Sequence, residues 1–203
     1  GPYTDKLTID NTQNVTITGM VDSVIVSGVM NDLFDIKNSA VVTLNNITVS
    51  DGGSCIHAKN STQLFLDGVT VKNCVRDDEG AGIKIDSGAS ATIANSVFDN
   101  NRTTKDNKEG GHIYTQGSLT VSNTSFDGGY ADFGGAIYAE TATAAVDIDN
   151  CDFTDNSAGT RGGSLYMFNG ATLDMDGGTF NGDGTTALTG NDGGAVYLNT
   201  ATH

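Results

Sequence analysis

One short pattern returns along the whole chain: two small residues, usually Gly-Gly, then a third residue, an aliphatic residue and often Tyr. Its clearest copies are Gly110–Tyr114, Gly134–Tyr138, Gly162–Tyr166 and Gly193–Tyr197, with looser copies at 80–84 and 52–56. Self-similarity at a fixed period, here about 22–28 residues, is the signature of a repeat protein. The chain is therefore read as a stack of one unit.

Each unit holds three short stretches in which apolar and polar residues alternate, which is typical of half-buried strands. In one unit these are 137–139, 146–148 and 151–153. A two-residue break separates the second stretch from the third, and its second residue is always Asn or Gly. The ladder consists of Gly19, Asn46, Gly68, Asn95, Asn123, Asn150 and Gly177. Asn and Gly accept the left-handed backbone conformation most readily, so the ladder predicts a sharp structural turn in every unit.

Three strands with a fixed corner predict an all-β fold, a single right-handed parallel β-helix of about seven coils. Stacked coils bury an inner face that one coil cannot bury alone. The predicted inner columns are Cys55, Ile83, Ile113, Ile137, Leu165 and Val196, and Val49, Val71, Phe98, Phe126, Phe153 and Phe180. Asn101 and Asn156 form a further column that satisfies corner backbone groups, with Asp183 in the same place and Cys74 and Gly129 as interruptions.

The chain is acidic, with a net charge of −15 at pH 7, and would repel a phosphate backbone, so nucleic acid is not an expected partner. No apolar run reaches the roughly 20 residues of a membrane helix. We interpret Gly1-Pro2 as a tag scar and residues 3–203 as one domain, a fragment of a longer repeat protein. Flanking coils and any membrane attachment would then belong to missing parts.

The chain has three cysteines, too few for a disulfide framework. Cys55 and Cys74 could meet in adjoining coils, and whether they are bonded stays open. No cofactor is indicated. Asp147 and Asp174 fall in one outward column, with Asp149 and Asp176 at the adjacent corner, and such paired carboxylates either face solvent or bind Ca²⁺. The acidic corners at 77–79 and 106–109 are expected to be solvated.

A column of four tyrosines is the main binding hypothesis: Tyr114, Tyr138, Tyr166 and Tyr197. Each follows an inward aliphatic residue and so points away from the core. An exposed aromatic strip would recognise a protein or a glycan, together with the variable corners at 99–109 and 181–192. The alternative is that the rings stack on one another beneath the long corners and stiffen the fold.

The pairing of Gly134-Gly135-Ala136-Ile137 with Phe153-x-x-Asn156 resembles the repeats of the chlamydial polymorphic outer membrane proteins. The resemblance covers residues 52–198 and implies an autotransporter-like β-helix passenger that acts as an adhesin. It implies a secreted protein at the cell surface, associated with the outer membrane, whose partners are host proteins or glycans. The Phe-x-x-Asn half departs from the pattern at Phe126-x-x-Gly129 and Phe180-x-x-Asp183.

Enzymes such as polysaccharide lyases and epimerases share this fold, so a carbohydrate-active enzyme is the rival interpretation, and a purely structural stalk is a third. The enzyme chemistry needs carboxylates clustered with Lys, Arg or His on one face, which the sequence pattern does not display. His57 is assigned to an inward core position and His112 to a corner. An outward Thr column suggestive of ice binding is broken by Phe65, Asp147 and Asp174. The sequence thus favours a non-enzymatic adhesion or recognition module.

Overall fold

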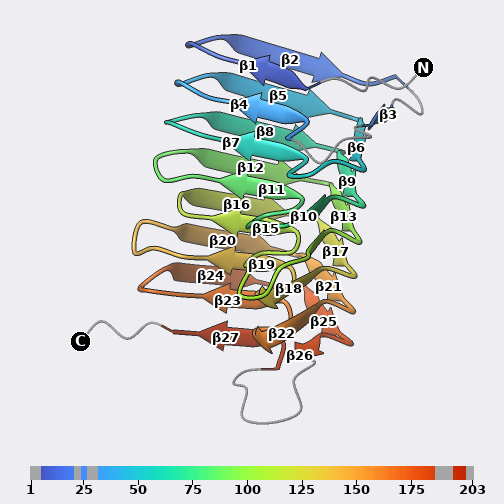
Figure 1. The fold of residues 1–203 in the computed structure, drawn as a ribbon, viewed down its shortest axis with the longest axis vertical. Helices are drawn as coiled ribbons and strands as arrows, with labels where there is room; N and C mark the ends of the chain where they lie inside the picture. Colours follow the sequence, from blue (N-terminus) through green and yellow to red (C-terminus); the bar gives the residue numbers. More distant parts are fainter. Residues whose placement is uncertain (1–5, 21–23, 27–31, 186–193, 200–203) are drawn as a thin grey trace.

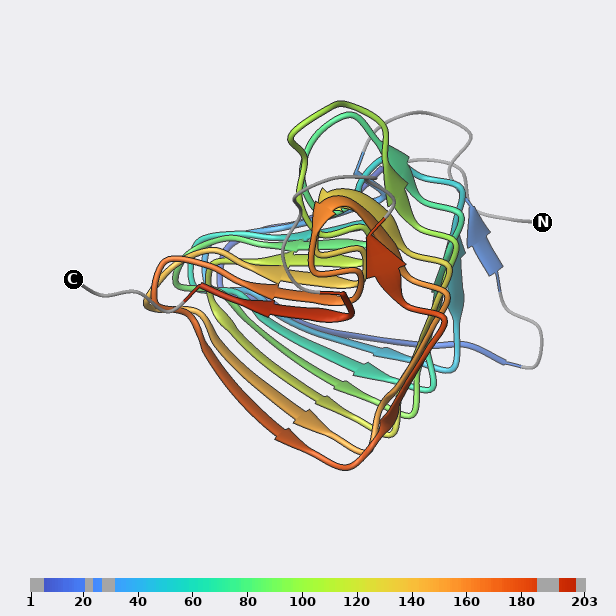
Figure 2. The ribbon, with the colours of Figure 1, turned by 90° about the horizontal axis from the view of Figure 1, so that it is seen from below.

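The computed structural model of the chain describes residues 6–20, 24–26, 32–185 and 194–199. These ranges contain short strands and no helix. Each strand pairs in parallel with its equivalents in the neighbouring coils, so the coils stack along a single axis (Figure 1). Viewed along that axis, successive coils keep a similar outline and are offset from one another (Figure 2). The protein is a parallel β-helix, as the repeat predicted.

The strands form four sheets that run the length of the stack. Sheet 1 comprises β1 (Leu7–Ile9), β4 (Phe34–Ile36), β7 (Ile56–Ala58), β11 (Ile83–Ile85), β15 (Ile113–Thr115), β19 (Ile137–Ala139), β23 (Leu165–Met167) and β27 (Val196–Leu198). Sheet 2 comprises β2 (Asn14–Thr18), β5 (Val41–Asn45), β8 (Gln63–Asp67), β12 (Ser90–Ala94), β16 (Ser118–Ser122), β20 (Ala145–Asp149) and β24 (Thr172–Asp176). Sheet 3 comprises β3 (Val24–Val26), β6 (Thr48–Ser50), β9 (Thr70–Lys72), β13 (Val97–Asp99), β17 (Ser125–Asp127), β21 (Asp152–Thr154) and β25 (Thr179–Asn181).

Sheet 4 was not predicted, because its strands lie in the variable corner that follows sheet 3. It comprises β10 (Val75–Arg76), β14 (Arg102–Thr103), β18 (Tyr130–Phe133), β22 (Ser157–Arg161) and β26 (Gly184–Thr185). These strands have two to five residues and no alternation of apolar and polar residues that would mark them in the sequence. The described coils from β10 onward thus carry a fourth strand, and sheet 4 leads the chain back toward sheet 1 (Figure 2).

Left-handed residues make the corners, as the Asn and Gly ladder predicted. Asn46, Gly68, Asn95, Asn123, Asn150 and Gly177 have φ between 47° and 67°, whereas Gly19 in the first coil is not among the positive-φ residues. The corner after sheet 3 repeats the device with Asp51, Asn73, Asn100, Gly128, Asp155 and Gly182. Asn, Asp and Gly tolerate this conformation better than other residues. Both corners are therefore specified locally in each coil.

The Gly-Gly pair has two separate physical causes. The first glycine, as at Gly134, has a φ of +64°, which side chains rarely adopt. The second, as at Gly135, has no room for a Cβ, because the carbonyl oxygens of Gly163 and Ser157 lie against it. The pair thus turns the chain from sheet 4 into sheet 1 and packs the coils tightly there.

The core is a set of stacked columns, and the phenylalanine column is its clearest part. Phe98, Phe126, Phe153 and Phe180 lie in register with ring centroids 4.9 Å apart. This distance equals the spacing of neighbouring strands, so identical rings stack from coil to coil. Phe98, Phe126 and Phe153 are completely buried.

One predicted inner column was out of register by one residue. Ile56, rather than Cys55, pairs with Ile83 across sheet 1. The Gly52-Gly53 pair is therefore one residue farther from its strand than the other copies are. Cys55 is buried beside this column and forms a disulfide with Cys74, with Cα atoms 5.9 Å apart, so the pairing that the sequence left open is present. Cys151 is a free, buried cysteine.

The predicted Asn column is continuous because a histidine crosses its gap. Asn101 and Asn156 are completely buried, and between their coils the column position is Gly129. His112 fills that place: its Nδ1 lies 2.9 Å from Asn101 Nδ2, and its Nε2 lies 3.1 Å from Asn156 Oδ1. A Cβ on Gly129 would lie 2.5 Å from His112 Cδ2, which explains the glycine. Burial lowers the pKa of His112 to about 3, so the ring is neutral.

Candidate functional site

The outer face of sheet 1 carries the side chains that can do chemistry. Residues in the middle of its strands point away from the core and line up from coil to coil. This central column reads Thr8, Asp35, His57, Lys84, Tyr114, Tyr138, Tyr166 and Tyr197. It is charged in the earlier coils and aromatic in the later ones.

Two further columns flank the central one. Before the strands, backbone hydrogen bonds place Glu109, Phe133 and Arg161 in equivalent positions, each accepting from the first glycine of the preceding pair. After the strands, the column reads Lys59, Asp86, Gln116, Glu140 and Phe168, each of which donates its backbone N–H to the preceding coil. We call the surface between these two flanking columns the sheet 1 groove. It follows the axis of the stack, so it crosses several coils.

His57 lies in the charged half of the groove, between two aspartates. Its Nδ1 is 3.3 Å from Asp32 Oδ2, and its Nε2 is 3.0 Å from Asp86 Oδ2. Burial would raise the pKa of both carboxyls, but the hydrogen bonds from His57 and the nearby cations outweigh it and hold both pKa values below the usual range. The assignment of His57 to the inner core is therefore wrong. It followed from the same one-residue slip that misplaced Cys55.

Asp35 is the next carboxylate along the groove. Lys59 Nζ lies 2.7 Å from its Oδ1, and Lys6 Nζ lies 2.9 Å from its Oδ2. Burial would raise the pKa of Asp35, but these two hydrogen bonds outweigh it and lower the pKa to about 2. The two oxygens of one carboxylate thus bind cations from two different coils.

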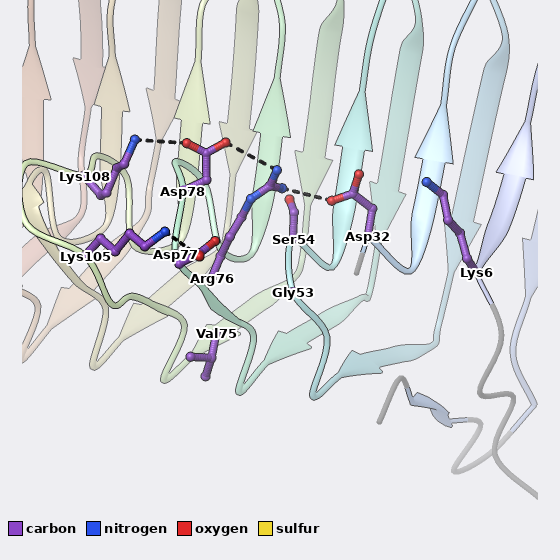
Figure 3. A pocket seen from close by; sticks show the side chains of 10 residues that line it. All are labelled: Lys6, Asp32, Gly53, Ser54, Val75, Arg76, Asp77, Asp78, Lys105 and Lys108. Atoms are coloured by element: carbon purple, nitrogen blue, oxygen red, sulfur yellow. Dashed lines mark hydrogen bonds and ion pairs between the residues drawn. The ribbon is translucent and has the colours of Figure 1, made fainter. Parts of the chain in front are cut away.

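A second ion-pair network continues from Asp32 (Figure 3). Arg76 Nη1 lies 2.9 Å from Asp32 Oδ1, and its Nη2 lies 3.5 Å from Asp78 Oδ2. Lys108 Nζ then binds Asp78 and Glu79, at 3.1 and 2.8 Å. The corner at 77–79, which was predicted to be solvated, is therefore only partly exposed to solvent. Asp78 and Glu79 are held in ion pairs, whereas Asp77 pairs with Lys105 at the surface.

The charges in this network fix one another. Burial would raise the pKa of Asp78, but hydrogen bonds from its neighbours and the nearby lysines lower it strongly. Lys108 has a raised pKa, mainly through its hydrogen bonds to Glu79 and Asp78. A cavity of about 440 Å³ opens above these groups, and Figure 3 shows its side chains in a row across successive coils. It is lined by Lys6, Asp32, Gly53, Ser54, Val75, Arg76, Asp77, Asp78, Lys105 and Lys108.

Basic side chains gather in this groove although the protein is strongly acidic. Seven of the ten Lys and Arg residues of the chain line or flank it: Lys6, Lys59, Arg76, Lys84, Lys105, Lys108 and Arg161. A mixed cluster of acids and bases on one face, which the sequence pattern did not display, is therefore present. The sequence favoured a binding module over an enzyme because its pattern showed no such cluster. Since the structure contains one, an enzyme is not excluded.

The aromatic half contains the predicted tyrosine column, but not as an exposed strip. Tyr114, Tyr138 and Tyr166 are only 5, 5 and 3% exposed. Tyr114 and Tyr138 stack with parallel rings, whereas Tyr138 meets Tyr166, and Tyr166 meets Tyr197, edge to face. The tyrosines point away from the core as predicted, and the geometry matches the alternative in which they stack beneath other residues.

A smaller cavity of about 260 Å³ lies over this column. We call it the aromatic cavity, and it is lined by Glu109, Phe133, Tyr138, Glu140, Arg161, Tyr166 and Phe168. Burial, and then the negative charge of Glu79, raises the pKa of Glu109 to about 7. Glu140 instead accepts hydrogen bonds from the Tyr114 hydroxyl and from Gln116 Nε2. The pKa of Tyr114 is raised by burial and by Glu140.

The predicted calcium residues lie elsewhere, on the exposed face of sheet 2. Asp147 pairs with Asp174, and Asp149 pairs with Asp176, in strict register. All four are exposed. In the part of the chain that the structure describes, no group of three or more His, Cys, Asp or Glu side chains is placed to hold a metal ion. Calcium binding at these paired carboxylates stays a prediction.

Of the two long corners that were predicted to take part in binding, the structure describes one fully and the other only in small part. The corner at 99–109 includes β14 and supplies Lys105, Lys108 and Glu109 to the groove. The corner at 181–192 lies largely outside the described residues. Also outside the described ranges are the first glycine of the copy at 193–197, and His203. Among the described residues there is no helix that is long and apolar enough to cross a membrane.

Comparison with known families agrees with this architecture. A family model described as "right handed beta helix region" matches residues 6–202, so the chain belongs to this family. The solenoid is thus the right-handed form of the parallel β-helix. The family fits a structural or adhesion module and also includes pectate lyase-like enzymes. No curated protein and no solved structure matches the chain.

Proposed function

We propose that this protein is a recognition module that binds an extended glycan along the sheet 1 groove. The observation that supports this most directly is the position of the acids, bases and aromatic rings on one outer face, with cavities of about 440 and 260 Å³ along it. Polar groups with two hydrogen-bonding oxygens or nitrogens match sugar hydroxyls, and aromatic rings match the apolar face of a sugar ring. The groove follows the stack axis, so it suits a chain of several sugar units.

The groove replaces the tyrosine strip as the proposed binding surface. Tyr114, Tyr138 and Tyr166 have too little exposed area to form a flat contact by themselves. They form the floor beneath groups that can reach a ligand, such as Phe168 and Glu109, which are both partly exposed. The predicted role of the tyrosines is therefore changed from direct contact to support.

The setting that we propose is an adhesion module of a larger exported protein at the cell surface. The resemblance to the polymorphic outer membrane protein repeats supports it, as does family membership. The Cys55–Cys74 disulfide also favours an oxidising, extracellular location, because such bonds are rare in reducing compartments. The glycan could then belong to a host cell surface, and attachment to a membrane would come from other parts of the protein.

A glycan panel tests the proposal. The wild-type protein is compared with Lys105→Ala/Lys108→Ala, which removes two cations from the groove, and with Lys72→Ala on sheet 3 as the matched control. We expect binding of at least one oligosaccharide, weakened in the double variant and unchanged in the control. Equal binding by all three proteins would refute the groove as the site, and no binding at all would favour a stalk.

An enzyme of the polysaccharide lyase or epimerase type is the second candidate. The observation that favours it is the direct contact of His57 with two carboxylates beside Lys84 and Arg76, since such chemistry needs a base and a neutralising cation. Incubation of the same oligosaccharides with the protein, followed by mass spectrometry, separates the two functions. Intact oligosaccharides support recognition alone, and shortened or isomerised products support an enzyme.

A further inference from the structure

The aromatic cavity has a floor and two walls from different columns. Tyr138 and Tyr166 form the floor, with centroids 5.1 Å apart. Phe133 from β18 lies against Tyr166 on one side, at 5.7 Å, and Phe168 lies on the other side, at 5.8 Å from Tyr166 and 6.3 Å from Tyr138. Phe133 and Phe168 are partly exposed, so part of each ring remains free for a ligand.

Two carboxyl groups line this cavity in different environments. Glu140 follows β19 and accepts hydrogen bonds from the Tyr114 hydroxyl and from Gln116 Nε2. Glu109 precedes the glycine pair on the opposite flank, and its backbone pairs with that of Phe133. It is partly buried and faces the negative charges of Glu79, Glu140 and Asp78, whereas the positive charge of Lys108 favours its ionised form. Its pKa is raised to about 7.

We infer that the aromatic cavity is the subsite for a single uncharged sugar ring, which stacks on Phe168 and Phe133 and accepts a hydrogen bond from Glu109. This inference rests on the proposed function, because it assigns one part of the groove to one unit of the glycan. The chemistry points to an uncharged ring, because an anionic sugar would meet Glu140 in the cavity and the nearby negative charge of Glu79, which also acts on Glu109. Arg161 and Lys108 lie on the same flank and are engaged with groups of the protein.

A bound ring would make binding depend on pH. The ring removes water from Glu109, and desolvation disfavours the charged form of a carboxyl. The un-ionised Glu109 then donates a hydrogen bond to a ring oxygen or hydroxyl. The binding-competent fraction falls as pH rises through about 7. The apparent dissociation constant should therefore increase about tenfold between pH 6 and pH 8.

The experiment measures dissociation constants by isothermal titration calorimetry at pH 6, 7 and 8. The probes are cellotetraose, chitotetraose and maltotetraose, with tetragalacturonate as the anionic comparison. The proteins are the wild type, Glu109→Gln and Phe168→Leu, with Asp127→Asn, an exposed residue of sheet 3, as the matched control. Circular dichroism confirms the fold of each variant. Leucine rather than alanine replaces Phe168, because it removes the aromatic ring and keeps an apolar side chain.

We expect a neutral tetrasaccharide to bind the wild type and the control with the tenfold change between pH 6 and pH 8. Glu109→Gln should bind at all three pH values with little change, because an amide stays an uncharged donor. Phe168→Leu should bind several-fold more weakly. Binding that is independent of pH and unaffected by both substitutions, but weakened by Lys105→Ala/Lys108→Ala, would overturn the subsite while leaving the groove intact. Stronger binding of tetragalacturonate would also overturn it. No binding of any probe would refute the proposed function itself.

Discussion

His112 provides the sharpest test of how the core is held together. The ring is completely buried, and each of its nitrogens meets an asparagine side chain. Asn101 Nδ2 already donates to Val71 O, and its Oδ1 accepts from Cys74 N, so its amide orientation is fixed. Nδ1 of His112 must therefore accept, and Nε2–H must donate to Asn156. A second proton on Nδ1 would face the Asn101 amide hydrogens.

The sign of the pH effect follows from two pKa values. In the unfolded chain His112 takes up a proton near its ordinary pKa of 6.5, whereas in the folded protein burial lowers the pKa to about 3. The stability that the neutral His112 ring contributes is complete above pH 6.5. It is lost as pH falls from 6.5 toward about 3, because the unfolded state binds more protons. For these values the loss between pH 7 and pH 5 is about 2 kcal/mol.

The perturbation is His112→Gln, which removes the titrating ring but keeps a polar side chain. Loss of one or two buried hydrogen bonds should lower the free energy of unfolding by about 1–3 kcal/mol at pH 7. Urea denaturation at pH 7, 6 and 5 then gives the difference between the two proteins at each pH. Every other titrating group is shared, so the difference should shrink by about 2 kcal/mol from pH 7 to pH 5. A difference that stays constant with pH would show that His112 is not held neutral and would refute the reasoning.

Three further predictions concern the corners and the cross-link. Gly129→Ala should lower the free energy of unfolding by about 1–3 kcal/mol, because its Cβ meets the His112 ring, whereas Gly184→Ala, with nothing within 4 Å, should leave the urea midpoint nearly unchanged. Asn123→Ala should cost about 1–2 kcal/mol, because its φ is 47°, and Asn123→Gly should cost less; equal midpoints would contradict the corner assignment. Cys55→Ser/Cys74→Ser should lower the free energy of unfolding by about 3 kcal/mol, as expected for a loop with a sequence separation of 19, and a reductant should affect only the wild type.

The sequence predicted the solenoid because every coil carries the same sequence signals for its strands and corners. A strand needs only alternation, and a corner needs only Asn, Asp or Gly, so both signals are local and repeated. Sheet 4 was not predicted, because strands such as Gly184–Thr185 are too short to show an alternation of apolar and polar residues. His112 was assigned to a corner, and nothing local in the sequence showed that its ring would replace an asparagine of a neighbouring coil.

The groove was missed for a different reason: its flanks are columns of unlike residues. Glu109, Phe133 and Arg161 share one position, immediately before the glycine pair, yet they have no common chemistry. A search for repeated residue types passes over such a column. The signal that could have found it is positional, because any residue at this place must lie beside the outer face of sheet 1. The slip at Cys55 then removed His57 from the same face.

Stacking at the spacing of parallel strands also explains why the groove changes character along its length. Identical aromatic rings stabilise one another when they stack, so phenylalanines and tyrosines can repeat from coil to coil. Identical charges cannot do so inside a partly buried groove, because each would raise the energy of its neighbour. The charged half accordingly alternates Asp35, His57 and Lys84 and surrounds each with partners of opposite sign. Like charges in register, such as Asp147 and Asp174, occur instead where the strand faces open solvent. A repeat fold can therefore keep one backbone throughout and still place different chemistry in successive coils, provided that every buried charge has its partner on a neighbouring column.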